Sequence, residues 1–424
     1  MKRCLYKPLL LISGLALSSS LFASGFRLEF QSASVLADAG EAAVVEDAGT
    51  NWYNSAGLVY IPHQLALSTI DVYAPTRFSG TASAPSTVLP IPPFNYLATG
   101  RASAHTNSIL PGFNYALPIQ NNLALGLTIA PAWGFIEDYG ENSLVRYNLT
   151  RVYTRTLDIA PSVAFRFNDH WSLGLGPDFH YFYVSSKAHV NTIPLTASDS
   201  TTRFSANDWA SGAHIGLLYR IDPATRIGLN YRTRMTMDLD GHSDFVLTGI
   251  AGFGTRNFKL KIPLPSTTTL SAYHDFSPRW ALMGTVSYDQ WNVLKHYHAR
   301  NVAQPGLPIP DVIQVQDMRD TVDVGVGTHY RWNDCWLFRA SIKYEPTPTI
   351  SAYRDVNFPD GRKLGFQIGG RYQYNKNIAL DFIYGHVFVK TVDINGTNAL
   401  TGASLSGHQR TKVDLAGAQL VWTI

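Results

Sequence analysis

Residues 364–374 read Leu-Gly-Phe-Gln-Ile-Gly-Gly-Arg-Tyr-Gln-Tyr, and this stretch shows the pattern that decides the fold. Apolar side chains occupy every second position, and glycine, glutamine or arginine stands between them. Successive side chains of a β-strand point to opposite faces, so this alternation predicts a strand with one apolar and one polar face. Residues 157–167 and 322–332 repeat the pattern.

Alternating segments recur along most of the chain. They begin near positions 63, 105, 121, 153, 171, 209, 226, 267, 280, 320, 336, 363, 377 and 411, fourteen in all. Short turns and long loops join them in alternation; the long loops are 74–104, 134–152, 187–208, 241–266, 291–319, 346–362 and 390–410. An even strand count with short turns at one end and long loops at the other is typical of outer-membrane barrels. We therefore expect an all-β, 14-stranded antiparallel transmembrane barrel in the outer membrane of a Gram-negative bacterium.

The composition of the 424 residues excludes other classes. Charged residues make up 15% and aromatic residues 12%. Disordered chains are rich in charge and poor in aromatics, so disorder is excluded. After residue 23, no run approaches the ~18 apolar residues of a membrane-spanning helix, which excludes a helical membrane bundle.

The N-terminus predicts export. Lys2, Arg3 and Lys7 precede an apolar run at residues 9–17, which is too short to span a bilayer. This arrangement is typical of a signal peptide, which we assign to residues 1–23. The full chain has a net charge of +3, and removing these three basic residues brings it to zero. A chain without net positive charge is not expected to bind nucleic acid.

Residues 24–62 do not alternate and are rich in small side chains. A barrel of fourteen strands has a lumen too wide for its own side chains to fill. We expect residues 24–62 to form a hatch inside the lumen, followed by the barrel at residues 63–424. A periplasmic tail is the alternative.

Several short motifs together resemble the FadL-type family of outer-membrane transporters of long-chain fatty acids and hydrocarbons. They are Gly25-Phe26-Arg27-Leu28-Glu29, Asp47-Ala48-Gly49, Asn54-Ser55-Ala56, Trp171-Ser172-Leu173-Gly174-Leu175-Gly176, Tyr231-Arg232-Thr233 and Leu264-Pro265. The resemblance implies a fourteen-stranded barrel with an N-terminal hatch and no energy-coupling partner. It also implies ligand capture at outer loops, hatch movement and lateral exit through a kinked strand.

Pro131 interrupts the alternating segment 123–134. Proline cannot donate to the strand ladder, so it marks a bulge or a break in pairing. In the family that this chain resembles, the corresponding strand kinks inward and opens the wall. We therefore expect Pro131 and Gly134 to form a lateral-exit kink; an irregular strand end is the alternative.

A fatty-acid carboxylate needs a basic or hydrogen-bonding partner in an apolar site. The resemblance places a basic residue near the ligand head group at Arg319, and gives Asn54 of the hatch a ligand contact. The alternative for Arg319 is an ion pair with Asp317 or Asp320.

Two outer loops, 187–208 and 241–266, carry many apolar side chains. Exposed apolar clusters mark binding sites, and in the family these loops form the entry groove. The expected apolar contacts to the ligand are Trp133, Phe135, Phe245, Phe253 and Phe258. The alternative is that the two loops pack only on each other.

Nothing in the sequence predicts catalysis, a cofactor or a metal site. His296 and His298 lack a third ligand, and no Ser/His/acid set has usable spacing. We expect a non-enzymatic monomer that contacts outer-membrane lipid and transports a hydrophobic small molecule. A general diffusion porin would lack an apolar pocket, and an outer-membrane lipid hydrolase would need an activated serine near a histidine. These two remain the alternatives.

Overall fold

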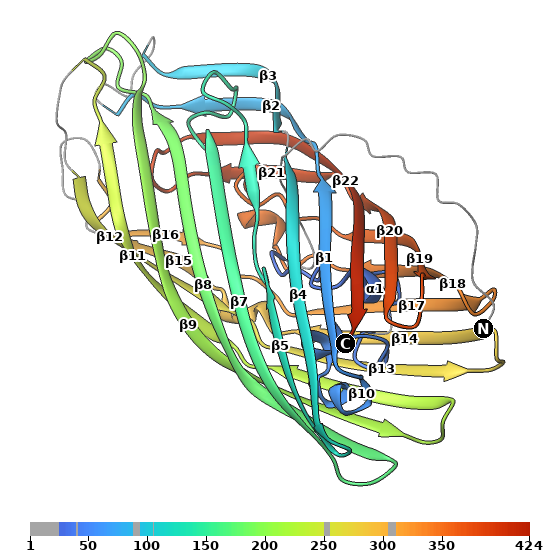
Figure 1. The fold of residues 1–424 in the computed structure, drawn as a ribbon. Coiled ribbons are helices and arrows are strands. Elements are labelled where there is room, and N and C mark those ends of the chain that lie inside the picture. The colour runs from blue at the N-terminus through green and yellow to red at the C-terminus, as the bar shows by residue number, and fades with distance from the viewer. Residues whose placement is uncertain (1–24, 40, 88–93, 105, 250–254, 304–310) are drawn as a thin grey trace.

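The computed structural model describes residues 25–39, 41–87, 94–104, 106–249, 255–303 and 311–424, and its main body is a closed antiparallel barrel of 14 strands (Figure 1). In order around the wall, the strands are β1 (Gln64–Tyr73), β4 (Asn107–Gln120), β5 (Leu123–Ala130), β7 (Arg151–Arg166), β8 (Trp171–Val190), β9 (Ser200–Arg220), β10 (Thr225–Arg232), β13 (Thr267–Asp275), β14 (Trp280–Asp289), β17 (Thr321–Arg331), β18 (Trp336–Glu345), β19 (Lys363–Gln373), β20 (Ile378–Val389) and β22 (Ser404–Thr423). The wall closes because β1 pairs with both β4 and β22. The predicted fold class is confirmed.

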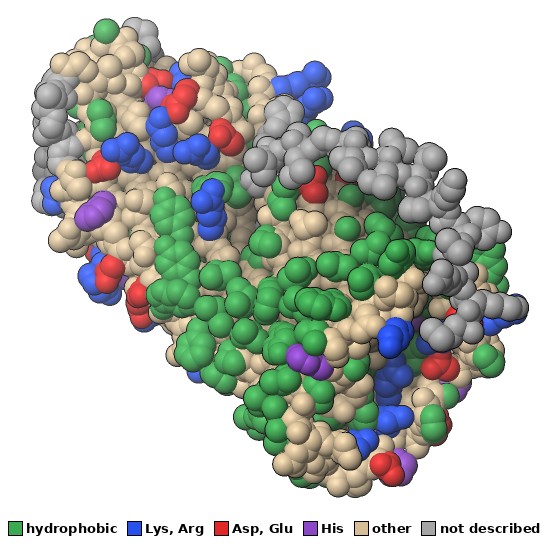
Figure 2. All heavy atoms as spheres, viewed as in Figure 1, with side chains coloured by type: hydrophobic (Ala, Val, Ile, Leu, Met, Phe, Trp, Pro, Cys, Tyr) green, Lys and Arg blue, Asp and Glu red, His purple; other side chains and the backbone are tan. Residues whose placement is uncertain are grey.

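The outer face of the barrel is apolar, as the alternation predicts. On β19, Leu364, Phe366 and Ile368 are exposed, whereas Gln367 between them is buried. Figure 2 shows a band of hydrophobic side chains across the wall that faces the viewer, with charged groups gathered toward the two ends. Such a band is the surface that a barrel presents to lipid.

No helix within the described ranges is long and apolar enough to cross a membrane. The short helices are α1 (Ala33–Leu36), α2 (Thr50–Tyr53), and the 3₁₀ turns η1 (Ser55–Tyr60), η2 (Trp291–Val293) and η3 (Ser351–Tyr353).

Most of the predicted long loops contain further strands. These are β2 (Thr76–Ala84), β3 (Tyr96–Ala104), β6 (Ile136–Asp138), β11 (Met235–Val246), β12 (Thr255–Leu264), β15 (His296–Arg300), β16 (Asp311–Val315) and β21 (Val392–Thr397). They extend the barrel at its outer end; β2, for example, pairs with both β3 and β22.

The boundaries predicted for loop 187–208 are wrong, because β8 continues to Val190 and β9 begins at Ser200. Beyond the lipid, water covers the outward face and polar side chains such as the exposed Arg203 occupy it. The apolar alternation that reveals the membrane strands is therefore lost in these extensions.

The N-terminal segment, residues 25–39 and 41–62, lies inside the barrel, where Figure 1 shows it in blue. Its side chains contact opposite parts of the wall: the Asn51 amide donates to the carbonyl oxygen of Ala160 on β7, and Arg371 on β19 pairs with Asp47. We call this segment the hatch. The expected signal peptide, residues 1–23, lies outside the described residues.

Glycines on the inner wall let the hatch approach closely. A Cβ atom at Gly228 would lie 1.8 Å from the carbonyl oxygen of Ala42, and one at Gly216 would lie 2.1 Å from Oδ1 of Asn54. These distances are far below van der Waals contact, so any larger residue at either position would displace the hatch.

Candidate functional site

An apolar cavity of about 170 Å³ lies among the outer strand extensions, above the start of the hatch. Its aromatic lining comes from six elements far apart in the sequence: Phe26, Phe135, Phe182, Phe204, Phe258 and Phe358. Aliphatic side chains of β12, β15 and β16 complete the wall, among them Leu260, Ala299 and Val312. A concave, mostly apolar site with a few polar groups is the usual form of a small-molecule site.

Phe26 of the hatch lies at the centre of an aromatic cluster beside this cavity. Its ring centroid lies 5.0 Å from that of Trp291, 5.7 Å from that of Phe135 and 5.8 Å from that of Trp133. These separations are typical of favourable edge-to-face contacts. The cluster therefore packs the first residues of the hatch against the cavity and the wall.

The wall is interrupted beside the same residues. β5 ends at Ala130, and the chain rejoins β7 at Phe135, whose carbonyl oxygen accepts from Thr154 N–H at 3.0 Å. The pairing continues in β6, which faces residues 151–153 of β7. Residues 132–134 pair with the hatch instead: Leu28 N–H donates to the carbonyl oxygen of Ala132 at 2.8 Å, and Gly134 N–H donates to that of Phe26 at 3.0 Å. The segment has left the wall and joined the hatch.

The neighbouring strand loses its partner at this point. β4 pairs with β5 only from Phe113 to Gln120, so among the described residues its outer half, 107–112, has no partner from β5. Continuing the register Phe113↔Ile129 would place Pro111 opposite Pro131. Neither proline can donate a backbone hydrogen bond, which explains why the break falls here.

The polar groups of the cavity are amides, one carboxyl group and the hydroxyl groups of Thr154, Ser186, Thr202 and Tyr297. Asn148, Gln314, Gln316, Asn357 and Asn398 line it together with Asp355, and none of its described lining residues is lysine or arginine. Burial raises the pKa of Asp355 above its usual range, against the opposing effect of hydrogen bonds from the Asn357 side chain and from the backbone N–H groups of Phe358 and Asn357. The cavity therefore contains no cationic side chain from the described residues.

The structure brings only some of the predicted ligand contacts together. Phe135 and Phe258 line the cavity, while Trp133 packs on Phe26 and borders a smaller cavity of about 40 Å³. Phe245 is buried in a separate cluster with Val190 and Leu247. Phe253 lies outside the described residues.

The two predicted polar contacts lie elsewhere. Asn54 is fully buried; its amide donates to the carbonyl oxygens of Ala42 and Leu217, at 2.7 and 3.1 Å, and its Oδ1 accepts from Ala56. Arg319 is exposed and is not among the residues that line the cavity.

Sequence reasoning missed Phe26, Phe182, Phe358 and Asp355. Phe26 stands in a quoted motif of the family resemblance, which is the one available signal. The others carry no local signal, because they reach the cavity only through strand register and loop folding.

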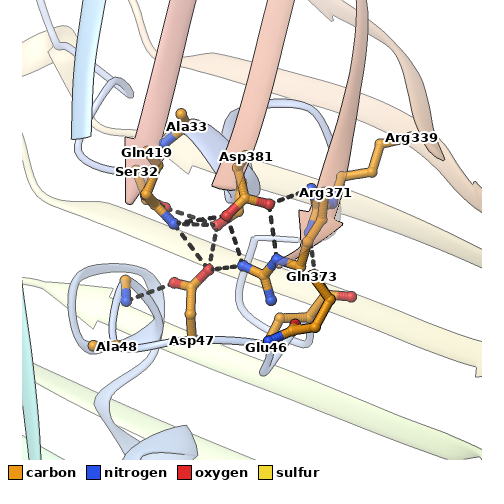
Figure 3. Close-up of polar contacts among 12 residues, drawn as sticks. Ser32, Ala33, Glu46, Asp47, Ala48, Arg339, Arg371, Gln373, Asp381 and Gln419 are labelled. Carbon is orange, nitrogen blue, oxygen red and sulfur yellow. Dashed lines mark hydrogen bonds and ion pairs between the residues drawn. The ribbon is translucent and has the colours of Figure 1, made fainter. Parts of the chain in front are cut away.

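Charged side chains fasten the hatch to the wall. Figure 3 shows Asp47 of the hatch between Arg371 of β19, at 2.5 Å, and Gln419 of β22, whose Nε2 lies 3.0 Å from Oδ2 of Asp47. Oε1 of the same Gln419 accepts from Ser32 of the hatch at 2.8 Å. Buried polar contacts therefore bind the hatch to β19 and to β22, the two strands that flank β20.

A second buried group joins Asp38 and Glu46 of the hatch to His329 and Arg339 of the wall. His329 Nε2 lies 2.6 Å from Oδ1 of Asp38, and its Nδ1 lies 3.1 Å from Oε1 of Glu46. The residue types would suit a metal ion, but Arg339 contacts both carboxylates and Asp381 as well. The guanidinium already supplies the positive charge there.

The interior wall also contains a hydrogen-bonded Ser/His/Asp set, contrary to the prediction that none has usable spacing. Ser162 Oγ lies 2.8 Å from Nε2 of His214, and His214 Nδ1 lies 2.7 Å from Oδ1 of Asp178. The three residues come from β7, β9 and β8, so their sequence separation hides the contact. All three are buried, and Arg232 also pairs with Asp178 at 2.7 Å. Neither Ser162 nor His214 lines either of the two cavities above.

A closed 14-stranded barrel that holds a hatch and an apolar outer cavity defines a class of outer-membrane transport barrels. The chain belongs to the outer membrane protein transport protein family (OMPP1/FadL/TodX), whose model matches residues 14–423. The family resemblance, the outer-membrane location in a Gram-negative bacterium and the transporter class are thereby confirmed.

Individual relatives are distant but cover the chain. A "Long-chain fatty acid transport protein" of Escherichia coli O6:H1 is 24% identical over 422 residues, covering 88% of this chain and 89% of the relative. The crystal structure of a Pseudomonas aeruginosa FadL homologue has a TM-score of 0.81 at 20% identity, covering 94% of this chain and 99% of its own. That of the Pseudomonas putida toluene transporter TodX has a TM-score of 0.70 at 16% identity, covering 95% and 100%. These structures share the fold.

Proposed function

We propose that this protein carries hydrophobic small molecules, such as long-chain fatty acids or hydrocarbons, across the outer membrane. The ligand is captured in the apolar cavity, residues 26–28 of the hatch shift, and the ligand leaves sideways through the break between β4 and β5. The printed names of relatives, a long-chain fatty acid transport protein and a toluene transporter, support this ligand class.

One observation carries the proposal. Phe26 lines the cavity with its ring, and its carbonyl oxygen accepts the hydrogen bond from Gly134 that holds the displaced segment against the hatch. A ligand that displaces the ring therefore disturbs the backbone pairing beside the break. Phe26 therefore links ligand binding in the cavity to the backbone pairing beside the break in the wall.

The two alternatives are less well supported. A diffusion porin needs a water-filled lumen, whereas here the hatch is buried against the wall on opposite sides. A lipid hydrolase needs a serine that its substrate can reach, whereas Ser162 is buried and lines neither of the two cavities.

Replacing Val312 with tryptophan tests the proposal. Val312 on β16 lines the cavity, whereas the next residue, Ile313, points away and is 53% exposed. Cells that carry Val312→Trp should take up labelled fatty acid or toluene roughly tenfold more slowly at equal protein abundance. Cells that carry Ile313→Trp, the matched control, should match the unmodified protein. Equal uptake by both variants would contradict capture in this cavity.

A further inference from the structure

We infer that the outer cavity prefers neutral hydrophobic molecules with a hydrogen-bond donor at one end, such as long-chain alcohols or phenols, over carboxylate anions. This inference rests on the proposed function and specifies the chemical class of its ligand.

The first observation is the position of the one acidic side chain. Asp355 lines the cavity from the loop between β18 and β19. Its Oδ1 accepts from the backbone N–H groups of Asn357 and Phe358, at 2.8 and 3.1 Å. The side chain of Asn357 also hydrogen-bonds to this carboxyl group. A carboxylate offers about four acceptor sites, so Asp355 can still accept a hydrogen bond from a ligand hydroxyl group.

The second observation is that no described cation accompanies Asp355. The adjacent Arg354 is turned away: its guanidinium donates to the carbonyl oxygens of Asp360 and Thr349. Asp355 forms no ion pair within the described part of the chain. An anionic head group would therefore enter an apolar site beside a carboxyl group, with no positive charge to compensate it, and this burial is costly.

The amides of the cavity are neutral, and several are already engaged, among them Gln314, whose Oε1 accepts from Ala399 N–H at 3.2 Å. Asn148 Nδ2 donates to the carbonyl oxygen of Ala403 at 3.0 Å, and Asn398 Nδ2 donates to that of Asn148 at 2.9 Å. Such groups can orient a hydroxyl group. They do not supply the charge-assisted hydrogen bonds by which arginine or lysine hold a carboxylate.

Equilibrium binding of decan-1-ol and decanoate to the full chain in detergent tests this inference. The two probes share one chain length, so their apolar contacts are equal and the head group decides the difference. Val312→Trp measures the background, because the tryptophan fills the cavity. The amount of probe that dissolves in the detergent micelles is the same for this variant and for the unmodified protein. At pH 8, where decanoate is ionised, decan-1-ol should bind roughly tenfold tighter or better.

Asp355→Asn removes the acid while keeping the side-chain shape. This variant should strengthen decanoate binding roughly tenfold and change decan-1-ol binding less than roughly threefold. Tighter binding of decanoate than of decan-1-ol to the unmodified protein, or an unchanged ratio in Asp355→Asn, would overturn the inference while leaving the transport function standing. Binding of neither probe above the Val312→Trp background would overturn the proposed function itself.

Discussion

The backbone N–H of Leu28 in the hatch donates a hydrogen bond of 2.8 Å to the carbonyl oxygen of Ala132 in the displaced part of the wall. The hatch thus takes the place of a neighbouring strand exactly where β4 and β5 separate. The contact links the movement of the hatch to the integrity of the wall, and the first prediction concerns the residue that begins the break.

Replacing Pro131 with valine should slow transport and leave ligand binding near normal. Valine restores a backbone donor and favours strand pairing, so residues 131–134 return in part to the wall. One recovered hydrogen bond contributes roughly 0.5–1.5 kcal/mol, which makes the closure partial. Uptake and binding are measured on the same preparation. Pro118→Val is the matched control, because Pro118 still pairs with Ala124 of β5, beside a register shift near the turn and away from the break. Normal uptake by Pro131→Val at normal abundance would show that Pro131 does not control the exit.

Asn54→Ala should loosen the hatch without weakening the cavity. The substitution removes two donated hydrogen bonds and one accepted bond from a buried side chain, and each unsatisfied partner costs about 1–3 kcal/mol. We expect more frequent openings in planar-bilayer recordings and an unchanged affinity for the hydrophobic ligand. A large loss of affinity for the hydrophobic ligand, with no increase in channel openings, would instead show that Asn54 contacts the ligand.

Arg339→Met should destabilise the protein strongly. The substitution leaves Asp38, Glu46 and Asp381 buried without their shared cation, and breaking a buried pair costs about 3–5 kcal/mol. The temperature at which the barrel unfolds in detergent should fall. It is measured by heating samples to increasing temperatures and separating folded from unfolded protein by gel electrophoresis.

Arg203→Met provides the comparison for this measurement. Arg203 pairs with Asp244 at 2.8 Å, but its side chain is 60% exposed, and exposed pairs contribute little. Its unfolding temperature should stay within a few degrees of that of the unmodified protein. A similar fall of the unfolding temperature in both variants would mean that the buried ion pairs between hatch and wall stabilise the protein no more than an exposed pair does.

Deleting residues 24–58 should leave a folded barrel that conducts small ions. The wall strands form their backbone pairs with one another and not with the deleted segment. Lys343 of β18, which pairs with Glu29 and Glu41 of the hatch, becomes hydrated by the open lumen. Planar-bilayer conductance should rise well above that of the full chain. Equal conductance from both proteins would show that the segment does not plug the lumen.

The barrel could be predicted from sequence because lipid imposes a local rule. A wall strand must place apolar side chains outward at every second position, and β19 follows this rule along residues 364–368. The rule ends with the lipid, which is why extensions such as β11 and β12 read as loops.

The site followed from sequence only in part, because distant segments build it. Pro131 breaks the ladder by its own chemistry and could be recognised alone. Asp355 and Phe182 reach the cavity only after the register of the whole wall is set. Asn54 stood in a recognisable motif, yet its amide binds backbone carbonyl oxygens, and no local pattern distinguishes that use from ligand binding.

Ser32 and Gln419 join the two ends of the chain across 387 residues, next to the seam where β1 meets β22. Such a contact cannot form until the final strand has been made and placed. Closing so long a loop costs entropy before any contact compensates it, so the event belongs late in folding. The pairing of β22 with β1 therefore closes the barrel and also fixes the hatch to the wall. A chain truncated within β22 would lose both the closure and this attachment of the hatch.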